Sequence, residues 1–233
     1  MFILLPPSEG KSPLPGKSAF APTSPALVAD TEGVLAHLRG MKPADRARFY
    51  GIKDTGKVEE ACLRTLHALD SPGIVALERY TGVVYAHIDY ASLTHKAAAR
   101  KHLLIVSALF GLVPGGALIP DYKLSMNPWL ARYWKDINAN RLQALAKGKP
   151  VLNLLSQSYR KAVDYPGLIT VDFRVQGGKK AAGHFGKAIK GRFVRWILEN
   201  GIKDAGDFDG FTEDGYRFDG ENFVQGELGG NSA

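Results

Sequence analysis

Short, continuous apolar runs are the feature that most limits how this chain can fold. They lie at residues 2–5, in the first half of 102–112, at 150–155 and at 168–175. Runs of this length without alternating polar residues are typical of strands that are buried inside a sheet. We therefore expect strands at these four places. The first of them ends abruptly, because two prolines follow it.

Amphipathic segments between these runs predict the helices. The clearest span about 25–39 (Ser24 as cap and Pro25 as first helical residue), 43–50, 54–69, 90–101 and 128–145 (Asn127 as cap). Strands and helices alternate without a regular rhythm, and there is no repeat or long linker. The expected fold is α+β or mixed α/β, a single compact domain over 1–233 with a central mixed sheet and surrounding helices. A terminal hairpin is expected at 211–226.

Charge is unevenly spread along the chain. The formal net charge is +7, and residues 151–200 hold nine basic and three acidic side chains. Residues 201–233 hold two basic and eight acidic ones. This balance is compatible with nucleic acid or anionic substrates without demanding them. The acidic end either shields the basic region or is simply a polar surface hairpin, and the sequence leaves both open.

The basic region includes an amphipathic helix expected at 184–201. Its apolar stripe consists of Phe185, Ile189, Phe193, Trp196 and Ile197. Lys187, Lys190 and Arg195 project away from the stripe, and the small residues Ala188, Gly191 and Val194 lie between them. A cationic face of low bulk allows close approach of a phosphate backbone. The alternative is an ordinary solvated helix face.

Polar side chains gather just after the predicted strands and turns. They are Ser8, Glu9, Lys11, Asp121, Tyr122, Lys123, Asn153, Ser156 and Tyr159. In α/β sheets, ligand sites form outside the carboxyl ends of strands, so we expect these residues to line one cleft. The alternative is that Asn153, Ser156 and Tyr159 only tie loops together, because buried polar networks are often structural.

Several common kinds of site are excluded because their sequence motifs are incomplete or absent. Gly10-Lys11-Ser12 resembles the end of a phosphate-binding loop, but Leu5 stands where that loop needs a glycine. No dinucleotide fingerprint and no nucleophile elbow occurs. The six histidines are scattered and the single cysteine, Cys62, is expected to be a buried hydrophobe. We expect no metal, iron included, and no cofactor.

We expect no targeting or membrane segment in this chain. The apolar start is cut off by Pro6-Pro7 and then Glu9, far short of a signal sequence. A single cysteine allows no disulfide within the chain, which suits a reducing compartment. We therefore expect a cytoplasmic protein with no membrane partner.

A set of short segments, taken in order, resembles the YaaA family of peroxide-stress proteins, also called DUF328 or UPF0246. The segments are ILLPPSEGK at 3–11, YTG at 80–82, SALFGL at 107–112, PDYKL at 120–124, YWKD at 133–136, VLNL at 151–154, residues 187–200, and Gly210-Phe211 with Gly215-Tyr216. Each is weak alone, but together they cover almost the whole chain. The resemblance adds Tyr80 and Thr81 to the candidate cleft.

This resemblance implies a mixed α/β fold peculiar to the family, with a positively charged cleft. It also implies binding of duplex or branched DNA, and a role in oxidative-stress protection that limits damage from unincorporated iron. The family carries a helix-hairpin-helix element, which by position is expected at 180–210. The chain departs from that pattern, because the second helix would be the weak, acidic segment 203–208.

Two functional hypotheses follow. In the first, the protein binds DNA through a basic cleft and helix. The expected phosphate contacts are Lys179, Lys180, Lys187, Lys190, Arg192 and Arg195. Lys187, Lys190 and Arg195 fall where the family has basic residues.

In the second hypothesis, the protein is an enzyme acting on a nucleic-acid or nucleoside-like ligand. Glu9 or Asp121 would be the general acid or base, and Lys11 or Lys123 an anion holder or amine nucleophile. The remaining candidates in this cleft are Ser8, Tyr80, Thr81, Asn153, Ser156 and Tyr159. No catalytic constellation is complete, so the sequence leaves both hypotheses open.

Overall fold

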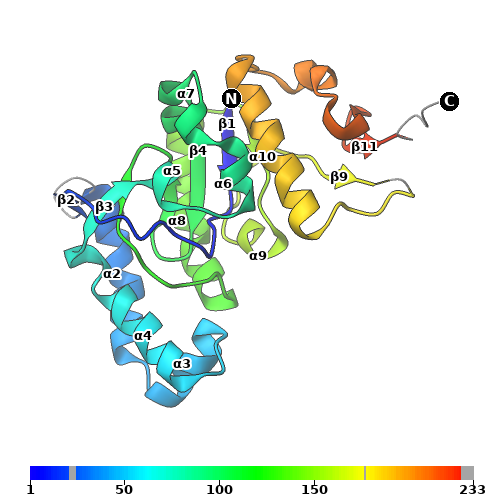
Figure 1. Cartoon of the computed structure of the whole chain (residues 1–233). Coiled ribbons are helices and arrows are strands. Elements are labelled where there is room, and N and C mark those ends of the chain that lie inside the picture. The colour runs from blue at the N-terminus through cyan, green and yellow to red at the C-terminus, as the bar shows by residue number, and fades with distance from the viewer. Residues whose placement is uncertain (21–24, 176, 227–233) are drawn as a thin grey trace.

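The centre of the molecule is a five-stranded sheet in the order β5-β4-β1-β7-β8 (Figure 1). The computed structural model describes residues 1–20, 25–175 and 177–226. The strands of this sheet are β1 (Phe2–Leu5), β4 (Leu103–Ser107), β5 (Gly111–Pro114), β7 (Val151–Asn153) and β8 (Leu168–Thr170). β1 runs parallel to β4 and β7, and β7 runs parallel to β8, whereas β5 returns antiparallel to β4.

The central strands are buried as the continuous apolar runs predicted. Every residue of β4 is buried, and so are Ile3, Leu4 and Leu5 of β1. The register places Ile3 beside Leu103 on one side and beside Leu152 on the other. Strands without a polar face need cover on both sides of the sheet, and the helices provide it. The mixed α/β prediction is therefore confirmed.

The helices lie around this sheet (Figure 1). They are α2 (Pro25–Gly40), α3 (Pro43–Tyr50), α4 (Thr55–Leu66), α5 (Ala76–Arg79), α6 (Val83–Ile88), α7 (Lys96–His102), α8 (Pro128–Ala146), α9 (Gln157–Arg160) and α10 (Gly183–Glu199). Short 3-10 helices span Ala68–Asp70, Tyr90–Ser92, Ala205–Gly210 and Glu213–Gly215. In the described part of the chain, none of the helices is long and apolar enough to cross a membrane.

Most helix predictions are confirmed, with one exception. The Asn127 side chain caps α8 by accepting a hydrogen bond from the Leu130 amide at 2.9 Å. The helix expected at 90–101 is wrong as one element, because the chain forms a 3-10 turn at Tyr90–Ser92 and starts α7 only at Lys96. The predicted cap Ser24 lies outside the described residues. Cys62 is buried, as expected.

Two small sheets flank the main one. The first has the order β2-β3-β6, and the second β10-β11-β9. Their strands are β2 (Ser18–Ala19), β3 (Pro72–Val75), β6 (Leu118–Ile119), β9 (Phe173–Arg174), β10 (Tyr216–Phe218) and β11 (Phe223–Gln225). The antiparallel pair of β10 and β11 confirms the terminal hairpin.

The single strand expected at 168–175 is wrong, because this stretch supplies β8 to one sheet and β9 to another. The break falls at Val171–Asp172. Asn222 accepts a hydrogen bond from the Asp172 amide at 3.1 Å, and the Asp172 carbonyl accepts one from the Phe223 amide at 2.9 Å. These bonds draw the chain away from β7 and toward β11.

Helix α10 is held on two sides. The predicted apolar stripe is confirmed at Ile189, Phe193 and Ile197, which are buried, whereas Phe185 at its start is exposed. The Phe193 ring packs 4.7 to 5.6 Å from those of Phe173, Phe208, Phe211 and Phe223. On another side it lies against α6 (Figure 1).

The small residues of α10 make that second contact close. A Cβ atom at Gly191 would lie 2.4 Å from the Val84 carbonyl oxygen and 2.6 Å from the His87 Cβ. Ala188, Gly191 and Val194 are buried. The expectation that they open a path for phosphate is therefore wrong: all three are buried, and the missing side chain of Gly191 serves the approach of two helices.

The region expected to hold a helix-hairpin-helix element does not contain one. Residues 180–210, all of which are described, form α10 and then only the 3-10 helix Ala205–Gly210. A compact helix–turn–helix unit is found instead at α3 and α4. Gly51 ends α3 at φ 68°, and the Asp54 side chain caps α4 by accepting a hydrogen bond from the Lys57 amide at 3.1 Å.

Candidate functional site

A cavity of about 270 Å³ lies at the carboxyl end of the parallel strands. The chain leaves β1 for β4 on one side and later reaches β7 on the other, so the crossovers diverge at β1. Sites in open α/β sheets form where the strand order reverses in this way. This strand-end cavity is lined by Pro6, Pro7, Ser8, Glu9, Gly10, Gly82, Val83, Val84, Tyr85, Leu154, Ser156, Lys187 and Lys190.

Two lysines of α10 reach this cavity. Lys187 is exposed, while Lys190 is half-buried and donates a hydrogen bond to the Leu154 carbonyl oxygen at 3.4 Å. Burial, together with Arg160 and Lys180 nearby, lowers the pKa of Lys190. Among the described residues, no carboxylate oxygen lies within 4.0 Å of either ammonium group. The cavity therefore has two cations that no acidic side chain neutralises at contact distance.

The other basic residues predicted to bind DNA are placed differently. Arg192 is ion-paired with Glu213 at 3.1 Å and with Asp214. Lys180 is paired with Asp172 at 2.6 Å. Lys179 is exposed near the turn between β9 and α10.

Arg195 is held as firmly as Arg192. Its guanidinium lies 3.6 Å from Glu199 and 3.7 Å from Asp89, and donates hydrogen bonds to the carbonyl oxygens of Ile88 and Asp89. These carbonyls end α6, so Arg195 clamps α10 to its neighbour. The six candidates thus divide into paired and unpaired groups.

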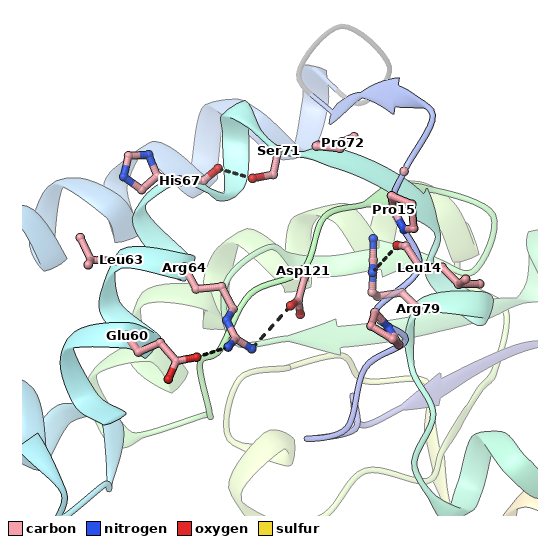
Figure 2. A pocket seen from close by; sticks show the side chains of 12 residues that line it. Leu14, Pro15, Glu60, Leu63, Arg64, His67, Ser71, Pro72, Arg79 and Asp121 are labelled. Atoms are coloured by element: carbon pink, nitrogen blue, oxygen red, sulfur yellow. Dashed lines mark hydrogen bonds and ion pairs between the residues drawn. The ribbon is translucent and has the colours of Figure 1, made fainter. Parts of the chain in front are cut away.

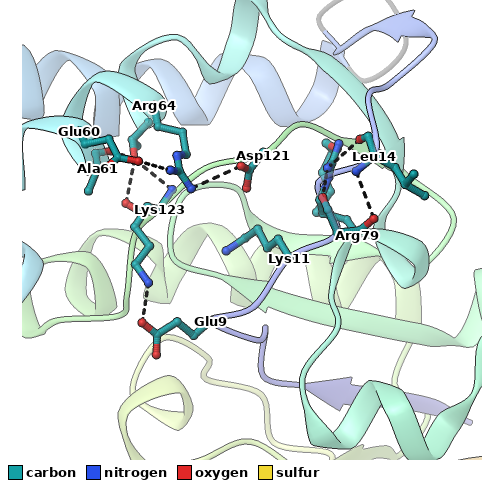
Figure 3. Close-up of polar contacts among 12 residues, drawn as sticks. Glu9, Lys11, Leu14, Glu60, Ala61, Arg64, Arg79, Asp121 and Lys123 are labelled. Carbon is teal, nitrogen blue, oxygen red and sulfur yellow. Dashed lines mark hydrogen bonds and ion pairs between the residues drawn. The ribbon is translucent and has the colours of Figure 1, made fainter. Parts of the chain in front are cut away.

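A second group of charged side chains, the Lys11 cluster, lies beside the cavity (Figure 3). Its members are Glu9, Lys11, Arg64, Asp121 and Lys123. Lys123 and Glu9 form an ion pair at 2.5 Å, and this hydrogen bond lowers the pKa of Glu9. Arg64 lies 3.5 Å from Asp121 and 2.5 Å from Glu60. The strand-end residues expected in one cleft therefore occupy two adjoining places that meet at Glu9.

The Lys11 side chain packs against the rings of two buried tyrosines. Its ammonium nitrogen is 4.3 Å from the centre of the Tyr122 ring and 5.7 Å from that of Tyr80. The two phenol groups hydrogen-bond each other at 2.8 Å, and Tyr122 bonds Ser107 at 2.8 Å. Burial of the ammonium lowers the pKa of Lys11 to about 8. Ser107 joins the site at the carboxyl end of β4, a role that the sequence analysis did not assign to it.

The remaining predicted cleft residues tie segments together. Asn153 is buried, donates to the Thr170 hydroxyl at 2.9 Å and accepts from the Leu155 amide at 3.1 Å. Ser8 accepts a hydrogen bond from the Thr81 amide at 3.1 Å, which joins the loop after β1 to the start of α6. Tyr159 accepts one from the Met126 amide at 3.4 Å. For Asn153 and Tyr159 the loop-tying alternative describes these contacts, whereas Ser156 lines the cavity.

Two arginines that the sequence analysis missed line a further hollow of about 460 Å³ (Figure 2). Arg79 is 2% exposed and donates to the carbonyl oxygens of Ser12 at 2.5 Å and Leu14 at 3.2 Å. It thereby anchors the loop that carries Lys11. Arg64 reaches the same hollow between Glu60 and Asp121. The one signal for Arg79 is its place directly before Tyr80-Thr81.

A third hollow, of about 370 Å³, joins the α3–α4 turn to the Lys11 cluster. Its lining includes Arg48, Gly51, Ile52, Glu9 and Lys123. Glu9 lines this hollow and also the strand-end cavity. The two are therefore neighbours on one side of the molecule.

No metal centre is evident in the described ranges, where no group of three or more His, Cys, Asp or Glu side chains is placed to hold an ion.

The sequence of this chain is similar to those of known proteins over most of its length. The family model described as "Peroxide stress protein YaaA" matches residues 1–222. A UPF0246 protein of Streptomyces coelicolor is 34% identical over 226 residues, covering 88% of this chain and 86% of the relative. UPF0246 proteins of Alteromonas mediterranea (33% identical; 88% of each chain) and Maricaulis maris (30% identical; 98% of this chain and 94% of the relative) are also similar.

Proposed function

The chain belongs to the YaaA (UPF0246) family of peroxide stress proteins, and from this premise we propose that it binds duplex or branched DNA during the peroxide stress response. The phosphate backbone would enter the strand-end cavity at Lys187 and Lys190. This differs from contact along the whole basic helix, because within the described ranges the cations without acidic partners lie at one end of that helix and Arg192 and Arg195 are ion-paired.

The observation that carries the proposal is the pair Lys187 and Lys190. They lie one helical turn apart, line one cavity with the Ser8 and Ser156 side chains, and have no carboxylate at ion-pair distance among the described residues. Phosphate contacts in DNA complexes come mainly from lysine, arginine and hydroxyl groups. Lys190 gains most from a phosphate, because burial already disfavours its charge and, in the described part of the chain, only the more distant Asp172 offsets that cost.

The helix–turn–helix unit of α3 and α4 adds support that rests on the family resemblance. The family resemblance implies a helix-hairpin-helix element, and this unit has the required plan of two helices joined by a short turn with a left-handed glycine, Gly51. Arg48 and Lys123 line the hollow beside the turn. A backbone crossing that hollow would pass Glu9 and reach the strand-end cavity.

The test is a salt-titrated binding assay with a short duplex and a four-way junction. The Lys187→Ala/Lys190→Ala variant is expected to bind about tenfold or more weakly, because it loses two charge-assisted contacts. Its slope of log K against log salt should be shallower by about 1.8, at about 0.9 for each lost phosphate contact.

A charge-matched control is available at the opposite ends of the strands. Lys101 and Lys149 are exposed and precede β4 and β7, so they lie at the amino ends of these strands. Lys101→Ala/Lys149→Ala removes the same charge and is expected to keep both affinity and slope nearly unchanged. Equal losses in the two double variants would mean that only net charge attracts DNA, and the cavity would lose its role.

The second candidate function is an enzyme acting on a nucleic-acid or nucleoside-like ligand. One observation favours it: Lys11 is half-buried against the Tyr122 ring with no contact carboxylate among the described residues, an unusual setting for a lysine that serves only as an anion holder.

A further inference from the structure

Two lysines of the Lys11 cluster have opposite settings. Lys123 is locked to Glu9 at 2.5 Å. Lys11 has no carboxylate oxygen within 4.0 Å among the described residues, and its only polar contact there is the Ser8 carbonyl oxygen at 3.4 Å. Figure 3 shows its side chain pointing into the space between Asp121 and Lys123. An amine that is not held by an acid is free to use its lone pair once it loses a proton.

The surroundings of Lys11 favour that loss. Burial lowers its pKa to about 8, and the charge of Lys123 acts in the same direction, while Asp121 and Glu9 oppose it. At pH 7.5 about a quarter of such amines are neutral, against about one in a thousand for an ordinary lysine. Lysines that form imines with carbonyl substrates are activated in this way, by desolvation and a neighbouring cation.

The position of Lys11 indicates which class of ligand its amine could contact. Its nitrogen contacts the Ser8 carbonyl, and Ser8 lines the strand-end cavity that Lys187 and Lys190 also line. Lys11 does not itself line that cavity, but its amine lies at the Ser8 carbonyl, on the loop that separates it from a phosphate held by those two lysines. We propose that the Lys11 amine forms an imine with an aldehyde that carries a neighbouring phosphate.

The chemistry balances without an oxidant or a cofactor. The neutral Lys11 nitrogen attacks the aldehyde carbon and gives up one of its two protons, while the carbonyl oxygen takes up a proton to give a carbinolamine. The nitrogen then loses its second proton, the oxygen takes up another and leaves as water as the carbon–oxygen bond breaks, and a carbon–nitrogen double bond remains. Starting from the ammonium form, one proton is released to solvent. Hydrolysis of the imine reverses every step.

The tyrosines under Lys11 act as positioning residues. Burial raises the pKa of Tyr122 well above its usual value, so its phenol stays neutral and cannot hold the ammonium as an ion pair. The hydrogen bonds that the Tyr122 hydroxyl shares with those of Tyr80 and Ser107 fix the ring in place. The ring therefore shields one side of the amine from water and leaves the other side for the ligand.

A phosphorylated aldehyde can come from two sources. One is an abasic deoxyribose within DNA, flanked by backbone phosphates, and the other is a free sugar phosphate in its open-chain form. The assignment of the phosphate site rests on the proposed DNA-binding function, whereas the reactivity of the Lys11 amine does not. A test with both sources separates the two claims.

The test is borohydride trapping followed by peptide mass mapping. The full-length protein is incubated with 2-deoxyribose 5-phosphate, or with a duplex holding one abasic site, and the imine is reduced. We expect Lys11 to gain the mass of the aldehyde less one oxygen atom. Lys11→Arg keeps the positive charge but is not a nucleophile at neutral pH, and it should lower the adduct yield about tenfold or more. Lys123→Arg is the matched control and should keep most of the yield.

Each outcome decides the matter. Lys11 adducts with both probes, or with the abasic duplex alone, support a DNA lesion as ligand, and adducts with the sugar phosphate alone support a small metabolite. If the intact duplex does not bind but the sugar phosphate still labels Lys11, the DNA proposal fails and the Lys11 assignment stands. Labelling of exposed lysines with Lys11 unmodified in the wild-type protein overturns the assignment, and this readout does not depend on whether a variant folds.

Discussion

The two halves of α10 carry similar basic charge but have different electrostatic surroundings. In the first half, Lys187 and Lys190 line the strand-end cavity without contact carboxylates among the described residues. In the second half, Arg192 and Arg195 are each held by two acidic side chains. The two pairs are separated by less than two helical turns, yet only the first pair can offer its charge to a ligand without breaking an ion pair.

The difference teaches that a count of charges along a helix does not locate a binding surface. The carboxylates that neutralise Arg192 come from Glu213 and Asp214, in the acidic segment at the end of the chain. That segment therefore does both things that the sequence left open. Its acidic side chains neutralise Arg192, and the strands β10 and β11 that follow them form a surface hairpin. Among the described residues Lys190 has no carboxylate at contact distance, because it lies at the ends of the parallel strands and donates its hydrogen bond to the Leu154 carbonyl oxygen.

The largest effect is expected where α10 meets α6, because this contact decides which side of the helix faces the cavity. Gly191→Val would place side-chain atoms within 2.4 Å of the Val84 carbonyl. We expect the free energy of unfolding to fall by about 3 kcal/mol through overpacking, measured by urea denaturation. Gly40→Ala is the control, since nothing lies within 4 Å of its Cβ position, and it should be neutral or slightly stabilising. A stable Gly191→Val protein with weaker DNA binding would instead support the expectation that phosphate approaches the helix at its small residues.

The second prediction concerns pH and the unpaired lysine of the loop after β1. Folding lowers the pKa of Lys11 from 10.5 to about 8, so between these values the unfolded chain binds more protons. Stability should therefore rise with pH in this window, by about 1 to 3 kcal/mol, relative to Lys11→Met. Below pH 8 both states hold the proton and the two curves run parallel. The groups that face the amine are Glu9, Arg64, Tyr80, Asp121, Tyr122 and Lys123.

Urea denaturation of the wild-type protein and Lys11→Met at intervals from pH 7 to 10 measures this difference. Curves that stay parallel across the whole window would contradict a buried, unpaired Lys11.

The third prediction concerns the paired half of the helix. Arg195→Met breaks the clamp on the Ile88 and Asp89 carbonyls. We expect a loss of about 1 kcal/mol in unfolding free energy, the usual net value of a hydrogen bond, and little change in DNA affinity. Chemical denaturation and the binding assay on the same samples separate these effects. A large loss of affinity with unchanged stability would place Arg195 on the DNA.

The smallest effect is expected from converting the paired half into an unpaired one. Glu213→Gln/Asp214→Asn releases Arg192, so DNA binding should tighten by about threefold and the salt slope should steepen by about 0.9. Asp209→Asn/Glu221→Gln removes the same charge from the same segment at exposed positions. If this control tightens binding equally, the long-range charge of the segment matters and the ion pair does not.

The central strands of the main sheet and the hairpin could be predicted because their patterns are local, whereas the edge strand β5 was not among the predicted strands. A run such as Phe2–Leu5 has no polar face, so only a buried strand accommodates it. The prediction of a single strand at 168–175 was wrong for a non-local reason. Asn222, some fifty residues away, accepts a hydrogen bond from the Asp172 amide, and this bond draws the chain out of the main sheet. The helix pair α3–α4 was predicted as two helices, but nothing local showed that its turn lies beside Lys123.

The sequence by itself determined the buried strands, the apolar stripe of α10 and the gathering of polar groups after strands, because periodicity and strand ends are properties of neighbouring residues. Only the tertiary structure decided which cations are neutralised, since the acids that pair with Arg192 and the tyrosines that bury Lys11 arrive from remote segments. Coulomb attraction and desolvation depend on distance in space, and distance in space between remote segments is set by packing.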